Sequence, residues 1–196
     1  MYPNNLGKGK PRRSHVPSLA AAIHSALVVD ALASRGGKLI GSRTKDRVGV
    51  GSKAPDFTLP SQSGEMASLK DFLGQKPVVL FFYPKDDTPG CTKQACAFRD
   101  GYEEFGTLDA EVVGISSDTV ASHERFAAKH DLPFTLLSDE GSKVRALYGV
   151  PSTLGLFPGR VTYVIDAEGV VRHIFSSQLD VKKHVEEARA ALNSIR

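Results

Sequence analysis

Two cysteines, Cys91 and Cys96, are the residues of this sequence best suited to redox or nucleophilic chemistry. Cys91 follows a continuous apolar run over residues 78–83 and a loop that contains two prolines. This pattern predicts that Cys91 lies in the first turn of a helix, where free backbone N–H groups and the positive end of the helix dipole favour a thiolate. Because the thiolate is the nucleophilic form of cysteine, the sequence nominates Cys91 as a reactive sulfur.

Cys96 lies five residues after Cys91. On an ideal helix, this spacing corresponds to ~7.5 Å of rise and ~140° of rotation, which puts the two Cα atoms roughly 8–9 Å apart. A disulfide needs Cα atoms within ~7 Å, so a bond between these cysteines requires local unwinding of the helix. We therefore expect the reduced and oxidised forms to differ between residues 91 and 96. The competing interpretation is two unrelated buried cysteines, a common fate of this residue type.

Other chemistries fit the sequence less well. A structural zinc site would need two suitably spaced histidines beside the cysteines, and the six histidines provide no such pair. The Cys-x-x-Cys spacing of disulfide exchangers is absent, and Gly149 and Gly155 do not form a phosphate-binding loop. His123 is the nearest histidine downstream of Cys91, which gives a Cys–His protease no local support. His173 lies in a predicted strand and is interpreted as a surface or packing residue.

The elements that must position Cys91 alternate between short apolar strands and amphipathic helices. The run 78–83 is apolar at every position, which is typical of a central strand covered on both faces. Near the C-terminus, residues 166–169 form the turn of a predicted hairpin. This order predicts an α/β fold in which helices flank a central mixed β-sheet. The expected strands are 57–59, 78–83, 111–116, 134–137, 160–165 and 170–175, and the expected helices are 70–73, 90–105, 119–131, 142–148 and 180–195, with Ser68 and Asp180 as N-caps.

Length and composition indicate one ordinary globular domain with an extension. The chain has 196 residues, of which 41% are hydrophobic and 24% are charged. At the usual size of domains, this length corresponds to about one domain plus a tail. No stretch approaches the ~18 consecutive apolar residues of a membrane-spanning helix. Two cysteines are also too few for a disulfide-built secreted scaffold.

The first 49 residues differ in charge from the rest of the chain. They carry nine Lys or Arg residues and two acids, whereas residues 50–196 carry 16 Lys or Arg residues and 20 acids. A mildly acidic body argues against nucleic acid as a partner. The basic, serine-containing segment 1–49, with a weakly amphipathic stretch at 19–33, fits a transit peptide better than a secretory signal. The alternative is a disordered basic tail without an address, and either interpretation leaves 50–196 as the folded domain.

Taken together, these residues resemble the peroxiredoxin family, which has a thioredoxin-like fold. The family's pattern Pro-x-x-x-Thr-x-x-Cys is present at residues 84–91. The sequence Ala-Pro-Asp-Phe-Thr-Leu at 54–59 also matches the family, as does Gly-Arg-Val-Thr-Tyr-Val-Ile-Asp at 159–166, which contains its active-site arginine. A second cysteine five residues after the first is typical of the subgroup called peroxiredoxin Q or bacterioferritin comigratory protein. The resemblance covers essentially all of residues 50–196.

The resemblance implies a role for each motif residue. Cys91 would be the peroxidatic cysteine, which attacks the peroxide and becomes a sulfenic acid. Cys96 would be the resolving cysteine, which closes an intramolecular disulfide with Cys91. Arg160 would stabilise the thiolate and hydrogen-bond the peroxide oxygens. Thr88 would hydrogen-bond the thiolate and position the peroxide, and Pro84 would shield the site from water.

The resemblance also implies a function and its partners. The protein would be a thiol peroxidase that reduces hydrogen peroxide and organic hydroperoxides in antioxidant defence and is recycled by thioredoxin, without a metal or an organic cofactor. An intramolecular disulfide needs no second subunit, so we expect a monomer. The segment 150–159 is similar to plant and cyanobacterial members, which favours a chloroplast address over a cytoplasmic one. Two alternatives stay open: a redox-sensing binding protein and a protein disulfide oxidoreductase that use the same disulfide.

Overall fold

The computed structural model describes residues 48–153 and 157–195. Nearly all of the leader, including the expected helix at 19–33, lies outside these residues. Within them, no helix is both long enough and apolar enough to cross a membrane.

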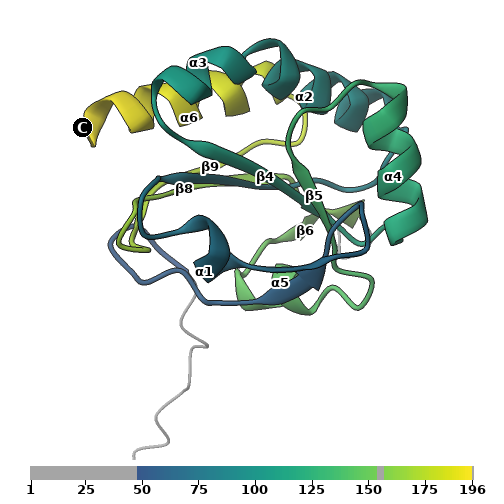
Figure 1. The fold of residues 1–196 in the computed structure, drawn as a ribbon, viewed down its shortest axis with the longest axis horizontal. Coiled ribbons are helices and arrows are strands. Elements are labelled where there is room, and N and C mark those ends of the chain that lie inside the picture. The colour runs from purple at the N-terminus through teal and green to yellow at the C-terminus, as the bar shows by residue number, and fades with distance from the viewer. Residues whose placement is uncertain (1–47, 154–156, 196) are drawn as a thin grey trace, which may run out of the picture. The chain divides into compact units, whose positions relative to one another are not determined.

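A five-stranded mixed sheet forms the centre of the fold (Figure 1). The strand order is β5-β4-β3-β8-β9, in which β3, β4 and β5 run parallel and β8 pairs antiparallel with both β3 and β9. This sheet confirms the fold class that the sequence predicts. Its strands are β3 (Val78–Phe82), β4 (Glu111–Ser116), β5 (Thr135–Ser138), β8 (Val161–Ile165) and β9 (Val171–Ser176).

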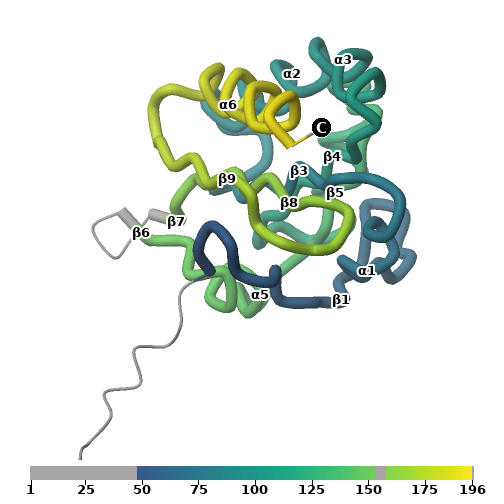
Figure 2. The backbone as a smooth tube through the Cα atoms, turned by 90° about the vertical axis from the view of Figure 1, so that its left-hand side faces the viewer, coloured from purple at the N-terminus to yellow at the C-terminus, as the bar shows by residue number. Residues whose placement is uncertain are grey.

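Helices cover both faces of the sheet (Figures 1 and 2). Every residue of β3 is buried, because successive side chains enter opposite layers. Phe81 stacks on Phe98 of α2, with ring centroids 4.5 Å apart. Phe82 packs instead against Tyr148, which follows α5, at 5.4 Å. One face carries α2 (Pro89–Asp100), α3 (Tyr102–Thr107), α4 (Val120–Lys129) and α6 (Val181–Ser194), and the other carries α1 (Leu69–Phe72) and α5 (Lys143–Leu147).

Two small antiparallel hairpins accompany the main sheet. One consists of β1 (Thr58–Pro60) and β2 (Met66–Ser68), and the other of β6 (Ser152–Thr153) and β7 (Phe157–Pro158). The predicted strand 57–59 corresponds to β1, displaced by one residue. The sequence analysis missed β2, β6 and β7, because strands of two or three residues are too short to show a periodic pattern.

The single helix predicted at 90–105 is wrong. In the structure α2 ends at Asp100, and α3 begins two residues later, after Gly101. The N–H of Gly101 donates to the carbonyl of Ala97 (3.2 Å), and the absence of a side chain leaves room for Val185 of α6. Buried aromatic residues continue on both sides of this break, so the apolar pattern alone does not reveal it.

Three helix starts show different capping. Thr119 caps α4, because its hydroxyl accepts a hydrogen bond from the N–H of Ser122 (3.2 Å). Ser68 precedes α1 as predicted, and its own N–H donates to Asp71 Oδ2 (2.7 Å). Asp180 also precedes α6 as predicted, but its side chain accepts no capping hydrogen bond, which corrects the expected role.

The strand register decides which loops meet at the edge of the sheet. Phe82, at the end of β3, pairs with Val161, at the start of antiparallel β8. The residues after β3 therefore lie beside the residues before β8. This pairing brings the segment 83–91 next to Arg160 in space, although about seventy positions of the sequence separate Cys91 from that arginine.

Candidate active site

Cys91 is the third residue of α2, at the sheet edge where β3 ends. Thr88 has extended backbone angles (φ −83°, ψ 146°), and Pro89 occupies the first helical position, where its missing N–H is no loss. The helix therefore begins where the sequence predicts it. Cys91 is 2% exposed, so its thiol is held among protein atoms with the free N–H groups of the first turn nearby.

The guanidinium of Arg160 lies directly beside the sulfur. Arg160 Nη2 is 3.4 Å from Cys91 Sγ, and the side chain is almost completely buried. A Cβ atom at Gly90 would lie 3.4 Å from the same Nη2, so the glycine permits this close approach. A buried cation beside a sulfur stabilises its negative charge, because little water screens the interaction.

Gln94 is a site residue that the sequence analysis missed. Its Oε1 accepts a hydrogen bond from Arg160 Nη1, and the residue is completely buried. The signal was available, since Gln94 follows Cys91 by three positions and therefore shares its helix face. Its Nε2 has no hydrogen-bond partner among the described residues. Gln94 and Cys91 together hold the two ends of the Arg160 guanidinium.

Thr88 and Pro84 belong to the loop that connects β3 with α2. The Thr88 hydroxyl donates to the backbone carbonyl of Lys85 (3.0 Å). The only hydroxyl proton of Thr88 is therefore used in this hydrogen bond, and the lone pairs of its oxygen remain available to accept others. This arrangement differs from the expected donation to the sulfur of Cys91. Pro84 is half-buried immediately after the Tyr83 end of the strand.

Cys96 lies on the same helix as Cys91, and its side chain is partly exposed. Both cysteines are free thiols, and α2 is continuous from Pro89 to Asp100. The structure therefore shows a regular helix here, and in a regular helix the sequence analysis predicts that Cys91 and Cys96 cannot form a disulfide.

A buried polar cluster supports the loop from behind. Asp86 Oδ1 accepts from the Tyr83 hydroxyl (2.7 Å), and Asp86 Oδ2 lies 2.8 Å from both His123 Nδ1 and Ser122 Oγ. Burial, followed by the charge of Asp86, raises the pKa of Tyr83 well above its ordinary value, so the phenol remains a donor. The sequence analysis considered His123 only as a possible partner of a catalytic cysteine. In the structure it contacts the loop rather than Cys91.

A second contact attaches the loop to the far end of α4. Asp87 Oδ1 lies 2.7 Å from Lys129 Nζ, and this hydrogen bond lowers the pKa of the Asp87 carboxyl. Asp87 itself has a left-handed backbone (φ 55°), which allows the loop to turn toward α2. Because Asp86 also contacts α4, the loop has two attachments that do not involve α2.

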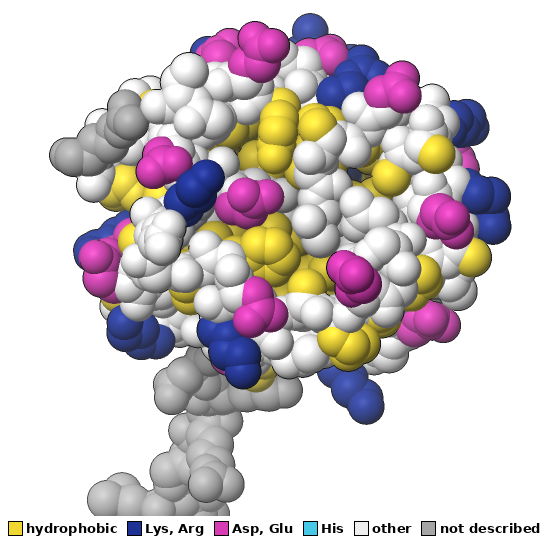
Figure 3. Space-filling view, viewed as in Figure 1, with side chains coloured by type: hydrophobic (Ala, Val, Ile, Leu, Met, Phe, Trp, Pro, Cys, Tyr) yellow, Lys and Arg dark blue, Asp and Glu magenta, His cyan; other side chains and the backbone are white. Residues whose placement is uncertain are grey.

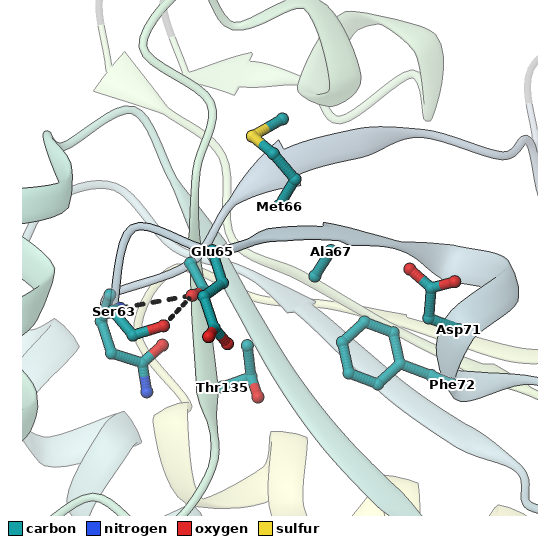
Figure 4. Close-up of a pocket in the computed structure, with 9 residues that line it drawn as sticks. Ser63, Glu65, Met66, Ala67, Asp71, Phe72 and Thr135 are labelled. Carbon is teal, nitrogen blue, oxygen red and sulfur yellow. Dashed lines mark hydrogen bonds between the residues drawn. The ribbon is translucent and has the colours of Figure 1, made fainter.

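A pocket of the described surface lies apart from the motif residues. On the face in Figure 3, acidic and basic side chains are interspersed around apolar ones. A pocket of ≈ 290 Å³ lies at the β1–β2 hairpin, where Met66 and Ala67 line it together with Phe72 of α1 and Thr135 of β5 (Figure 4). None of the motif residues lines this pocket, so we do not assign it to the chemistry of Cys91.

Comparison with known proteins identifies the family. Residues 50–174 match the model of the AhpC/TSA family. The chain is 56% identical over 150 residues to the chloroplastic peroxiredoxin Q of Triticum aestivum, an alignment that covers 76% of this chain and 69% of that protein. This chain belongs to the peroxiredoxin family. It is also 56% identical over 151 residues to the chloroplastic peroxiredoxin Q of Sedum lineare, with 76% of this chain and 81% of that protein covered.

Solved structures of peroxiredoxins agree with this membership. The peroxidoxin BcpB of Mycobacterium tuberculosis matches with a TM-score of 0.70 at 42% identity, over 75% of this chain and 97% of that one. The peroxiredoxin Q of Xanthomonas campestris matches with a TM-score of 0.65 at 30% identity, over 70% and 90% of the two chains. The chain is thus a thiol peroxidase of the peroxiredoxin Q type with a thioredoxin-like fold, as the motifs predict. Its chloroplastic relatives also support the transit peptide and plastid address predicted for the leader.

Proposed function

We propose that this peroxiredoxin reduces hydroperoxides through Cys91, resolves the product with Cys96 and is recycled by thioredoxin. The observation that carries the proposal is the burial of Cys91 Sγ in the first turn of α2, 3.4 Å from the Arg160 guanidinium. Family membership supports the peroxidase chemistry, and the geometry supports the assignment of roles to individual residues.

In the first step, the Cys91 thiolate attacks the distal oxygen of the hydroperoxide. The S–O bond forms while the O–O bond breaks, so the sulfur loses two electrons and the peroxide gains them. The products are a sulfenic acid on Cys91 and an alcohol, or water when the substrate is hydrogen peroxide. The leaving oxygen becomes negative as the O–O bond breaks, and Arg160 is placed to stabilise that charge.

Thr88 orients the peroxide in this proposal by accepting a hydrogen bond. Its proton is donated to the Lys85 carbonyl, so its oxygen can accept from the peroxide O–H. The N–H groups of Gly90 and Cys91, in the first turn of α2, are additional donors for the peroxide oxygens. Half-buried Pro84 covers one side of the site and limits the access of water.

In the second step, Cys96 attacks the sulfur of the Cys91 sulfenic acid. The S–S bond forms, the S–O bond breaks, and the hydroxyl leaves as water with the proton of the Cys96 thiol. Because α2 keeps the two cysteines apart, its first turns must unwind before this step. The contacts of Asp86 and Asp87 with α4 are independent of α2, so they can retain the loop while the helix opens.

Thioredoxin then reduces the disulfide with two electrons from its own dithiol, which returns both cysteines to thiols. We propose that the chain acts as a monomer in the chloroplast, because the disulfide lies within one chain and the relatives are chloroplastic. A structural study of the bacterioferritin comigratory protein of Xanthomonas campestris, 29% identical to this chain, concerns alkyl peroxide reduction. Alkyl hydroperoxides are therefore proposed as substrates beside hydrogen peroxide.

A coupled assay with thioredoxin, its reductase and NADPH tests this function. We expect Cys91→Ser to abolish peroxide consumption. Cys96→Ser should consume one equivalent of peroxide and accumulate a sulfenic acid, measured by dimedone trapping and mass spectrometry. Normal recycling of Cys96→Ser by thioredoxin would show that Cys96 is not the resolving residue.

The two alternative functions give different results in the same assay. A redox sensor would turn over peroxide slowly and change its partner binding on oxidation. A protein disulfide oxidoreductase would reduce insulin disulfides with thioredoxin-like rates and would not need peroxide. Rapid peroxide turnover that depends on Cys91, without insulin reduction, distinguishes the peroxidase from both.

A further inference from the structure

Arg145 of α5 is a buried arginine that the reaction steps above do not use. It is 6% exposed, and no carboxylate lies within ion-pair distance of its guanidinium among the described residues. A buried charge without an opposite partner is unfavourable, so such a residue requires a specific reason for its position. Its Nε also has no hydrogen-bond partner in the described part of the chain.

The two ends of the Arg145 guanidinium contact the two halves of the active site. Nη2 donates to the backbone carbonyl of Tyr83 (2.5 Å), and Nη1 donates to the backbone carbonyl of Gly159 (2.8 Å). Tyr83 immediately precedes Pro84, and Gly159 immediately precedes Arg160. One side chain thus connects the start of the loop that leads to Cys91 with the segment that leads through Arg160 into β8.

The sheet does not provide this connection by itself. The last pair of the β3–β8 ladder is Phe82 with Val161, so Tyr83 and Gly159 lie one and two residues beyond it. Only glycine fits at position 159, because a Cβ atom there would lie 2.0 Å from the carbonyl oxygen of Pro151. The planar guanidinium has two donors in a fixed geometry, which suits it to bridge two carbonyl groups at a set spacing.

The surroundings of Arg145 act on its own charge. Burial lowers the pKa of Arg145, while the negative charges of Asp139 and Cys91 oppose that shift. The ring of Phe82, 5.7 Å from the guanidinium carbon, adds a favourable contact for the cation.

We propose that Arg145 is a positioning residue for the peroxidase reaction: it holds the segment before Pro84 and the segment before Arg160 in register, and so keeps Arg160 beside Cys91. This inference rests on the proposed function, in which Cys91 and Arg160 must approach the same peroxide. It assigns no contact between Arg145 and the peroxide itself.

The experiment compares Arg145→Met and Arg145→Lys with the native protein, all in a Cys96→Ser background that leaves Cys91 as the only thiol. Two quantities are measured: the second-order rate of Cys91 oxidation by hydrogen peroxide, and the pH profile of Cys91 alkylation by iodoacetamide. Arg145→Met should lower the oxidation rate by on the order of 100-fold, as expected for a misplaced reacting group. It should also move the alkylation profile to higher pH.

Arg145→Lys separates the bridge from the charge. Lysine retains the charge but cannot bridge two carbonyls with a rigid fork. It should therefore lower the oxidation rate and move the alkylation profile in the same direction as Arg145→Met, by a smaller amount, because Arg160 is held less firmly beside Cys91. Arg125→Met, which removes an exposed arginine of α4, is the matched control and should leave both measurements unchanged.

Two results would overturn the inference. One is a folded Arg145→Met protein with the native rate and profile. The other is a reduced rate with an unchanged alkylation profile in both variants, which would reduce Arg145 to a general packing role. If Arg145→Met does not fold, the rate of Cys91 oxidation in Arg145→Lys tests the inference: a reduced rate supports it, and the native rate overturns it. Alkylation requires no peroxide, so the effect of Arg145 on Cys91 can be judged even if the native protein proves not to be a peroxidase.

Discussion

Two completely buried histidines support the two segments of the candidate active site, and the two rings have different hydrogen-bond partners. His123 of α4 contacts Asp86, in the loop that leads to Cys91. His184 of α6 contacts Thr162, two residues after Arg160 on β8. Each histidine therefore connects a helix to one of the two segments that bring Cys91 and Arg160 together.

His123 is hydrogen-bonded to a carboxyl group. Its Nδ1 lies 2.8 Å from Asp86 Oδ2, and its Nε2 lies 3.2 Å from the carbonyl of Leu137. Asp86 accepts from the hydroxyls of Tyr83 and Ser122 as well, so its carboxyl group joins the start of the loop to two side chains of α4.

His184 is held as a neutral ring. Its Nε2 donates to the carbonyl of Ser177 (2.9 Å), and its Nδ1 accepts from the Thr162 hydroxyl (2.8 Å). Burial lowers the pKa of His184 to about 4, and the positive charge of Arg160 contributes to that shift. No carboxyl group lies within hydrogen-bond distance of this ring among the described residues, whereas Asp86 lies 2.8 Å from His123.

The two rings therefore have different surroundings. Behind Arg160, the ring has a hydroxyl and a carbonyl as partners, and burial keeps it neutral. Behind the Cys91 loop, the ring contacts a carboxyl group that also accepts from a phenol and a hydroxyl. The same residue type thus supports both segments with different hydrogen-bond partners.

Asp86→Ala should produce the largest effect in this comparison. It leaves the ring of His123 and the hydroxyls of Tyr83 and Ser122 without their common partner, and each unsatisfied buried group costs about 1–3 kcal/mol of unfolding free energy. Urea unfolding at pH 7 measures the loss. The double variant Asp86→Ala with His123→Leu should be more stable than Asp86→Ala alone, because it also removes the unpaired ring. A double variant less stable than the single one would contradict the pairing of Asp86 with His123.

Asp87→Ala is the matched control for that experiment. Asp87 is the next residue in the loop, but its ion pair with Lys129 is largely exposed to solvent. Exposed pairs contribute about 0–1 kcal/mol, so this variant should unfold within that range of the native protein. A loss as large as that of Asp86→Ala would show that any loop substitution destabilises the fold.

The pH dependence of stability should reveal His184. An unfolded histidine binds a proton near its ordinary pKa of 6.5, whereas the buried ring resists protonation until about pH 4. Stability from this residue is therefore complete above pH 6.5 and is lost as the pH falls toward 4, by up to about 3 kcal/mol. His184→Gln should flatten this part of the curve relative to the native protein. Equal slopes for both proteins between pH 6.5 and 4.5 would refute a neutral His184.

The contrast between local and distant residues also explains how far the sequence could be interpreted. The strand before Cys91, the helix that starts at Pro89 and the spacing of Cys96 are local patterns, and each was predicted from a continuous segment. The contact between Arg160 and Cys91 depends on the pairing of β3 with β8, so the residues alone could suggest it only through the family motif.

The supporting residues could not be predicted for related reasons. Asp86 and His123 are 37 positions apart and meet only after α4 packs against the sheet. The break at Gly101 was hidden by apolar residues that continue across it. No sequence pattern shows that His184 is neutral, because its burial, together with the charge of Arg160, arises only in the folded chain.

The smallest expected effects compare one hydroxyl from each region. Tyr83→Phe leaves a buried carboxyl oxygen of Asp86 without its donor, and an unsatisfied buried group costs about 1–3 kcal/mol. Thr162→Val removes a hydrogen bond to the neutral His184 with little change in volume, and bonds between neutral groups contribute about 0.5–1.5 kcal/mol. Unfolding of both variants at pH 7 should therefore show the larger loss for Tyr83→Phe. The reverse order would contradict the central position of Asp86 in its cluster.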